Sequence, residues 1–226
     1  MHSISSDLAS TTVYGSVQAG AGLARYKMPE KEMDPRAAYR FIKDELDLDG
    51  QPGLNLASFV TTYMEPEAEQ LMMENLKKNF IDVEEYPACG EIEKRCVNII
   101  GNLFHAPMDQ ENGDALGVST VGSSEAIILA CLAAKKRWQK ARRAAGKSTD
   151  SPNIVMSSAV HVCWEKAARY LDVEEKFVYV TEDKFVMDPK AAVDLVDENT
   201  ILVCALLGTT YTGQYEDVKG ISDLLE

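Results

Sequence analysis

Hydrophobic residues recur at helical spacing along much of the chain. Tyr39, Ile42 and Leu46 follow Asp34-Pro35, where an aspartate cap precedes a proline at the first helical position. This pattern predicts a helix that starts at Pro35. The same spacing predicts further helices over about residues 66–76, 87–105, 123–145, 160–170 and 189–197.

Short apolar stretches alternate with the later helices and predict strands over residues 153–157, 176–180 and 201–207. The run from Ile201 to Leu207 contains no polar residue, which is typical of a strand buried on both faces. Helices between strands imply right-handed crossovers and a largely parallel sheet. Because ligands of such α/β sheets bind beyond the carboxyl ends of the strands, we expect Gly208 to Thr210 on the binding edge.

Composition narrows the classes of partner. The chain has 36 acidic and 23 basic residues and a formal net charge of −13, which argues against nucleic acid and anionic membranes as partners. The five cysteines form no CxxC pair, and the three histidines have no metal-ligand spacing. We therefore expect reduced thiols, a cytoplasmic location and no metal. A basic cluster over residues 135–147 is interpreted as a solvated helix end.

Small hydroxylated residues open the longest predicted helix, in the stretch from Thr120 to Ala126. The first turn of a helix has free backbone N–H groups and a partial positive charge. Gly122 lets an anion approach closely, and Ser123 and Ser124 add hydroxyl donors, which indicates phosphate binding. The alternative is an ordinary serine N-cap, and the residues alone favour that cap.

Several separated segments occur in a specific order from about residue 28 to the end. They are Leu54–Val60, Lys78–Asp82, Glu84–Pro87, Arg95–Asn98, Gly122–Ala126, Val162–Lys166, Met187–Pro189, Asp197–Thr200 and Thr210–Gly213. Together they resemble the glutamate decarboxylases, which are group II pyridoxal-phosphate decarboxylases of the aspartate-aminotransferase fold type. No dinucleotide fingerprint, P-loop or nucleophile elbow competes with this resemblance.

The resemblance implies a fold and a domain organisation. It implies an incomplete aspartate-aminotransferase-like (type I) large domain with a mostly parallel sheet, preceded by a helical segment. Residues 1–30 are expected to be a flexible N-terminus, and residues 31–60 the N-terminal helical segment. Residues 61–226 are expected to be the first part of the cofactor-binding large domain.

The resemblance also implies the residues that bind pyridoxal 5'-phosphate. Ser123 and Ser124 match the residues that bind the cofactor phosphate, and Thr210 matches a threonine close to the cofactor ring. His161 matches the residue that stacks on the pyridine ring, where close glutamate decarboxylases usually carry glutamine and other group II decarboxylases carry histidine. Without the resemblance, His161 is a histidine at a helix start and Thr210 is a turn hydroxyl.

The substrate residues follow from the same resemblance. Ser58, Phe59 and Asp82 match positions that recognise the distal carboxylate of glutamate. Taken alone, Ser58 is a turn hydroxyl and Asp82 a solvated loop acid. The family builds its site between two subunits, so the resemblance implies a homo-oligomer that converts L-glutamate to 4-aminobutanoate and carbon dioxide.

The Schiff-base lysine of this chemistry has no counterpart in the chain. In the family it lies in a Ser-Gly-His-Lys segment, and the carboxylate that pairs with the pyridinium nitrogen lies in a His-Val-Asp-Ala-Ala segment, neither of which occurs here. We therefore expect these 226 residues to be the front part of the enzyme and inactive alone. The alternatives are another group II decarboxylase or lyase, which His161 favours, and a non-catalytic truncated subunit.

Overall fold

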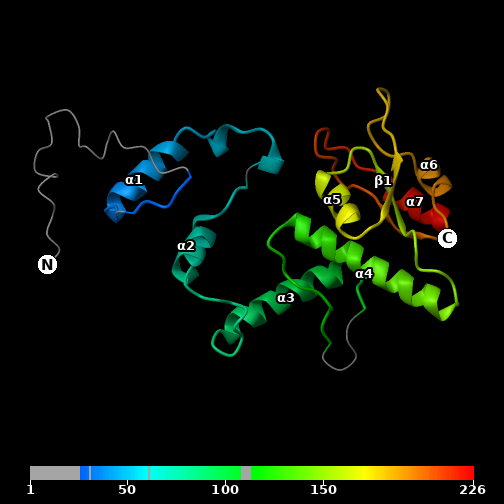
Figure 1. Ribbon diagram of the computed structural model, residues 1–226, viewed down its shortest axis with the longest axis horizontal. Coiled ribbons are helices and arrows are strands. Elements are labelled where there is room, and N and C mark those ends of the chain that lie inside the picture. Colours follow the sequence, from blue (N-terminus) through cyan, green and yellow to red (C-terminus); the bar gives the residue numbers. More distant parts are fainter. Residues whose placement is uncertain (1–25, 31, 61, 108–112) are drawn as a thin grey trace, which may run out of the picture. The chain divides into compact units, whose positions relative to one another are not determined.

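The computed structural model describes residues 26–30, 32–60, 62–107 and 113–226 (Figure 1). The chain divides into two compact units, Met1–Gln70 and Leu71–Glu226. Apart from residues 26–30, the predicted flexible segment 1–30 lies outside the described residues. No helix in the described ranges combines the length and apolar character needed to cross a membrane.

The first unit starts with the helix α1, Pro35–Leu46, as the sequence predicts. The Asp34 carboxylate caps it by accepting the backbone N–H groups of Arg36 and Ala37 at 2.9 and 3.3 Å. Two short 3-10 helices follow, η3 at Pro52–Leu54 and η4 at Ser58–Val60. The helix α2, Pro66–Asn75, spans the division between the units and confirms the helix predicted there.

The helix α3, Pro87–Leu103, binds residues 114 and 115 of the segment that precedes the longest helix. Asn98 holds this segment with its amide, which donates to Asp114 Oδ1 at 2.9 Å and accepts the N–H of Ala115 at 2.7 Å. The backbone at Gly117 can lie close to α3 because Gly117 has no side chain, and a Cβ there would lie 2.6 Å from Val97 Cγ1 of that helix. These contacts fix the chain shortly before Gly122.

A three-stranded sheet forms the centre of the second unit. It contains β1 (Asn153–Ser157), β2 (Glu174–Val178) and β3 (Thr200–Cys204) in the order β2-β1-β3, with both pairings parallel. The predicted α/β class, parallel sheet and first strand are confirmed. The second strand starts and ends two residues earlier than predicted, and the third ends at Cys204 instead of Leu207.

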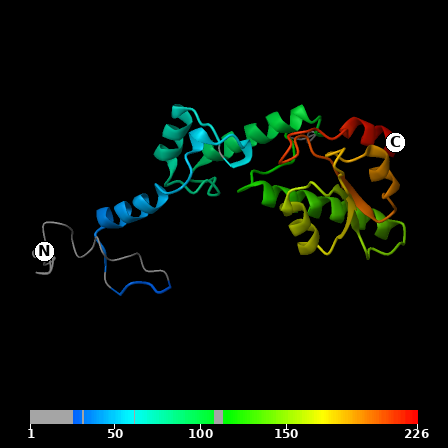
Figure 2. The same cartoon turned by 90° about the horizontal axis from the view of Figure 1, so that it is seen from above.

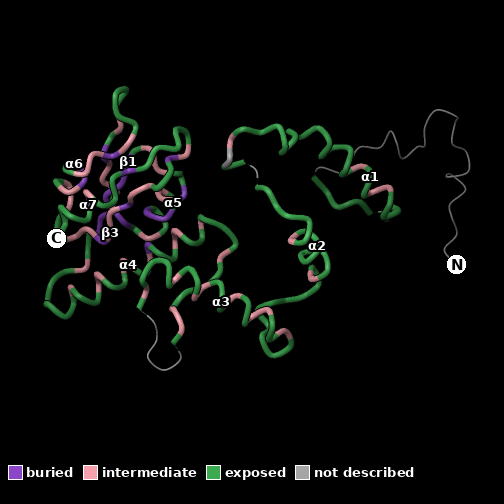
Figure 3. Tube along the Cα trace, turned by 180° about the vertical axis from the view of Figure 1, so that it is seen from behind, coloured by how far each residue is buried: buried purple, intermediate pink, exposed green. Residues whose placement is uncertain are grey.

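Two layers of helices enclose the sheet. The helices α4 (Ser123–Ala144) and α5 (Val162–Tyr170) cover one face, and α6 (Pro189–Asp194) and α7 (Val218–Leu225) cover the other (Figures 1 and 2). Buried residues concentrate in this part of the unit (Figure 3). The chain therefore folds here as helix, sheet and helix layers.

The strand buried on both faces is β1, not the stretch Ile201–Leu207 that the sequence indicates. Ile154 and Met156 pack towards α4 and α5, whereas Val155 between them packs towards α6 and α7. Because β1 has a neighbour on each side, both of its faces and both of its edges are covered. In the described sheet β3 pairs only with β1, and Leu207 beyond its end is 68% exposed.

The C-terminal half of α4 is anchored beside the amino end of β3. The indole N–H of Trp138 donates to the carbonyl oxygen of Glu198 at 3.0 Å, and the Glu198 carboxylate pairs with Arg142 and Lys147 at 3.1 and 2.8 Å. Arg142, whose side chain is 12% exposed, and Lys147 thus hold the chain two residues before β3. Five members of the cluster are exposed, as expected for a solvated helix end, namely Lys136, Arg137, Lys140, Arg143 and Lys147.

This anchoring also places the other end of α4. From Ser123 to Trp138 the helix rises about 22 Å at about 1.5 Å per residue. From Glu198, where Trp138 is anchored, to Cys204 at the end of β3 the chain rises about 20 Å at about 3.3 Å per residue. The first turn of α4 therefore lies close to the carboxyl end of β3.

A polar network ties the three strands together at their amino ends. The buried amide of Asn153 donates to Asp197 Oδ1 at 2.8 Å and accepts the hydroxyl of Thr200 at 2.7 Å. Lys176 Nζ, from β2, lies 2.6 Å from Asp197 Oδ2. Hydrogen bonds from Lys176 and then Asn153 hold the pKa of the Asp197 carboxyl well below its usual range.

We predict that Asp197→Ala destabilises the second unit by about 1–3 kcal/mol, because it leaves the buried Asn153 amide without an acceptor. The pKa of Asp197 is lowered in the folded state. Its stabilisation is therefore full above the unfolded pKa of about 3.9 and is lost progressively as the pH falls from there towards the lowered folded pKa. Urea unfolding at pH 7 and pH 3 measures this. A deficit of equal size at both pH values would contradict it.

Candidate active site

Three segments meet at the carboxyl edge of the sheet. They are the start of α4, the turn after β1 and the loop after β3, because parallel strands and their return helices bring these ends to one edge. Four of the predicted site residues lie on these segments, namely Ser123, Ser124, His161 and Thr210. This edge is therefore the candidate cofactor site.

The first turn of α4 has no side-chain cap in the part of the chain that the structure describes. Gly122 is the N-cap, with an extended backbone, so Ser123 and Ser124 occupy the first two helical positions. The alternative of an ordinary serine N-cap was therefore wrong. The Glu125 carboxylate reaches back to the N–H of Val121 at 2.8 Å, outside the helix. A Cβ on Gly122 would meet nothing within 4 Å, so the space before the helix is open.

His161 is the N-cap of α5, at the end of the turn after β1. Its Nδ1 accepts the backbone N–H of Cys163 at 3.2 Å and lies 2.6 Å from the Cys163 sulfur. Since Nδ1 is an acceptor, the proton of the neutral ring lies on Nε2. The exposed imidazole is thus fixed at one end, with its other nitrogen directed away from the cap.

Two serines that the sequence analysis did not single out shape the turn before His161. The buried hydroxyl of Ser157 accepts the N–H of Ala159 at 3.1 Å. The hydroxyl of Ser158 accepts the N–H of Val180 at 3.1 Å. The preference of serine for turns is the signal that could have found them.

The loop after β3 is a small hairpin that carries Thr210. Thr209 is buried and holds both sides of it, with its N–H donating to Gln214 O at 3.0 Å and its hydroxyl 2.6 Å from that of Thr212. Gly208 has φ +109°, a conformation that a side chain would strain. Thr210 is half-buried next to these two residues.

Glu216 closes the base of this hairpin and was missed by the sequence analysis. Its side chain is 2% exposed, although an isolated glutamate in a polar stretch is typical of the surface. Both carboxylate oxygens accept backbone N–H groups, from Met187 at 3.1 Å and from Leu206 at 2.7 Å. No pattern of spacing or composition distinguishes it from the exposed Asp217 that follows.

The predicted substrate residues lie in both units. Ser58 and Phe59 are in η4 of the first unit, where the Phe59 ring is 58% exposed. Asp82 is an exposed residue of the second unit, and its Oδ1 accepts the N–H of Glu85 at 3.3 Å in a turn. The roles of these three residues remain predictions.

The five cysteines are all free thiols. Burial, followed by the charges of Glu216 and Cys131, raises the pKa of the Cys204 thiol to about 12, and burial raises that of Cys131. These two thiols are therefore poor nucleophiles. Within the described ranges, no three His, Cys, Asp or Glu residues come together in a way that could hold a metal ion.

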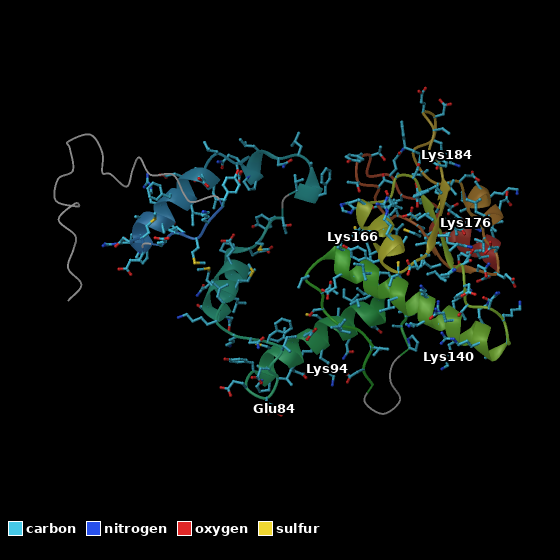
Figure 4. The ribbon with its side chains drawn as sticks, in the orientation of Figure 1. Glu84, Lys94, Lys140, Lys166, Lys176 and Lys184 are labelled. Atoms are coloured by element: carbon cyan, nitrogen blue, oxygen red, sulfur yellow. The ribbon has the colours of Figure 1, made fainter. Side chains whose placement is uncertain are left out.

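Three lysines of the second unit contact an acidic or aromatic side chain (Figure 4). Lys176 pairs with Asp197 at the amino edge, and Lys184 lies 2.6 Å from Asp188. Lys166 lies over the ring of Tyr170, 5.7 Å from its centre. The absence of a Schiff-base lysine from this chain remains a prediction based on the sequence.

Comparisons with known proteins relate these features to one family. The profile of the "Pyridoxal-dependent decarboxylase conserved domain" matches residues 29–226. The chain is 53% identical to glutamate decarboxylase 1 of Arabidopsis thaliana over 225 residues, which cover 99% of this chain and 45% of that protein. It therefore spans about half the length of the curated relatives it matches.

Solved structures show the same fold. The glutamate decarboxylase of Lactobacillus brevis superposes with a TM-score of 0.83 and 43% identity, over 94% of this chain and 48% of that chain. The sphingosine-1-phosphate lyase of Burkholderia pseudomallei has a TM-score of 0.69 at 18% identity, over 89% and 46%, and supports the fold alone. The predicted type I fold is thereby confirmed for this part of the protein.

The site fits the pyridoxal 5'-phosphate of this family. A phosphate group is an anion with several acceptor oxygens, and the first turn of α4 presents N–H donors that no side chain caps in the described residues. The hydroxyls of Ser123 and Ser124 stand at the same turn, and the space at Gly122 is open. These groups would hold the phosphate of the cofactor.

We predict that Ser123→Ala combined with Ser124→Ala weakens pyridoxal phosphate binding by about 100- to 10,000-fold in the complete protein, because two hydrogen bonds are lost. Each hydrogen bond lost to a charged phosphate costs roughly 1.5–3 kcal/mol. Thermal stability without cofactor should change little, because Gly122 rather than a serine caps the helix. Absorbance titration measures the affinity, with Ser222→Ala in α7 as a control. An unchanged affinity would make the two serines ordinary helix residues.

Proposed function

The chain belongs to the pyridoxal-dependent decarboxylase family, and from this premise we propose that the complete protein is a glutamate decarboxylase. It would convert L-glutamate to 4-aminobutanoate and carbon dioxide. The observation that carries this proposal is the 53% identity to a protein named glutamate decarboxylase over nearly the whole chain. The 43% identity to the Lactobacillus brevis structure supports it.

The residues at the carboxyl edge would bind and orient the cofactor, which when bound withdraws electrons from the α-carbon as the carboxyl group leaves. The start of α4 would hold the phosphate with its N–H groups and the hydroxyls of Ser123 and Ser124. The His161 ring, fixed through Nδ1, would stack on the pyridine ring. Thr210 would contact the ring from the loop after β3.

Ser58, Phe59 and Asp82 would select glutamate by its distal carboxylate. The Ser58 hydroxyl has the chemistry of a donor to that carboxylate, and the exposed Phe59 ring can cover the methylene groups of the substrate. Asp82 is exposed, which leaves its second oxygen accessible beyond the turn that it closes. This assignment rests on the resemblance of the three positions to those of the family.

The complete protein would be a cytoplasmic homo-oligomer with the site shared between subunits. The helix α3 has an apolar surface on which Ile92, Ile99 and Leu103 are each at least 60% exposed. A surface of this kind would be covered in the complete protein by its remaining part or by a second subunit. The five free cysteines agree with a reducing compartment.

A second candidate is a group II decarboxylase with another amino acid as substrate. His161 favours it, because the resemblance places histidine at this position mainly in other members of the group. The two candidates share the cofactor and the site at the carboxyl edge. They differ only in the side chain of the amino acid they accept.

We predict that the complete protein, loaded with pyridoxal phosphate, releases carbon dioxide from L-glutamate in preference to aspartate and aromatic amino acids. The measurement is carbon dioxide release for each substrate at equal concentration, with 4-aminobutanoate identified as the product. A preference for an aromatic amino acid would replace the proposed function by the second candidate.

We predict that Asp82→Ala lowers the ratio of kcat/KM for glutamate to that for aspartate by about tenfold. A hydrogen bond between Asp82 and the distal carboxyl group, with one proton shared between the two acids, would be charge-assisted and worth roughly 1.5–3 kcal/mol. Glu84→Ala, which removes another carboxylate from the same exposed segment, is the control and should leave the ratio unchanged. If both variants keep the ratio, Asp82 only closes its turn.

A further inference from the structure

The carboxylate of Glu216, at the base of the hairpin that carries Thr210, is buried. A carboxylate is costly to bury unless each oxygen finds a donor, and here both do. The backbone of Glu216 adds a third bond, because its N–H donates to the carbonyl oxygen of Leu206 at 2.9 Å. Glu216 and Leu206 thus bind each other through two separate hydrogen bonds.

The two N–H donors belong to connections that leave different strands. Leu206 opens the loop that follows β3 and carries Thr210. Met187 is buried just before Asp188, the N-cap of α6, in the connection that follows β2. Since β2 and β3 lie on opposite sides of β1, Glu216 links the two connections across the carboxyl edge of the sheet.

This link also accounts for where β3 ends. The apolar run continues to Leu207, and its composition would suit a longer strand. The N–H of Leu206 is instead taken by the Glu216 carboxylate, and Gly208 follows with a positive φ. The chain therefore leaves the strand at Cys204 and turns into the hairpin.

The hairpin is held together by its own hydrogen bonds. The position of its base, where Leu206 pairs with Glu216, therefore determines where its other residues lie. Thr209 bonds to Gln214 and Thr212, and Leu207 pairs with Tyr215 in an antiparallel bridge. Glu216 fixes this base to the connection after β2 through Met187, in addition to the packing of Leu206 against the core. A shift at Leu206 would be passed on to Thr210 by a hairpin that keeps its shape.

We propose that Glu216 is a positioning residue that holds Thr210 against the bound cofactor. This inference rests on the proposed use of Thr210 at the cofactor ring. Hydrophobic packing alone would be satisfied by an apolar residue at position 216. A carboxylate there provides two acceptors in a fixed geometry, which is what a link between two backbone segments requires.

The test compares E216Q with D197N in the complete protein. Glutamine keeps the shape of the side chain but replaces one acceptor oxygen with an NH₂ group that faces a backbone N–H. Asp197 undergoes the same change from carboxylate to amide at the amino edge, away from the cofactor. D197N therefore controls for the loss of charge and of stability.

E216Q should raise the dissociation constant of pyridoxal phosphate about tenfold and shift the absorbance maximum of the bound cofactor. Its amides at Leu206 and Met187 should exchange hydrogen faster in the absence of cofactor. D197N should lower the melting temperature but leave the affinity and the absorbance maximum unchanged. E216D, which keeps the charge on a shorter side chain, should fall between the wild type and E216Q.

Faster exchange at Leu206 in E216Q with unchanged affinity and spectrum would overturn the proposal, because the link would then be structural only. An equal loss of affinity in D197N would also overturn it. If E216Q does not fold, the same readouts on E216D decide the proposal. A wild-type protein that binds pyridoxal phosphate but does not decarboxylate glutamate would contradict the proposed function and leave this test of Glu216 in force.

Discussion

The direction of the strands is the constraint on which the site depends. Three parallel strands place all their carboxyl ends at one edge, and each helix that returns to the sheet starts at that edge. The anchoring of Trp138 and Arg142 at Glu198 fixes the position of α4 along β3, so that the first turn of α4 lies close to the carboxyl end of the strand. Residues far apart in sequence therefore reach one site.

Polar groups are paired with one another at the amino edge of the sheet and left available at the carboxyl edge. At the amino edge, Asn153, Asp197, Thr200 and Lys176 satisfy one another, and the result is a link between strands. At the carboxyl edge, the first-turn donors of α4 have no side-chain cap among the described residues. Stability at one end and available donors at the other are what a scaffold for an anionic cofactor requires.

Much of the fold was predictable because it depends on local signals. The caps at Asp34 and Asp188 and the proline that follows each of them fixed two helix starts, and periodicity fixed the long helix from Ser123. The end of β3 was not predictable, because it depends on Glu216, which lies ten residues beyond Leu206 and has no sequence signature of burial. The N-cap at Gly122 was also missed, because serine is the preferred cap in isolation.

The proposed site requires the first turn of α4 to bind the phosphate of the cofactor. A crystal structure of the complete protein with pyridoxal phosphate would show whether it does. We expect phosphate oxygens within hydrogen-bonding distance of the backbone N–H groups and hydroxyls of Ser123 and Ser124, with Thr210 at the ring. A phosphate bound elsewhere, with the first turn of α4 in contact with solvent or another side chain, would contradict it.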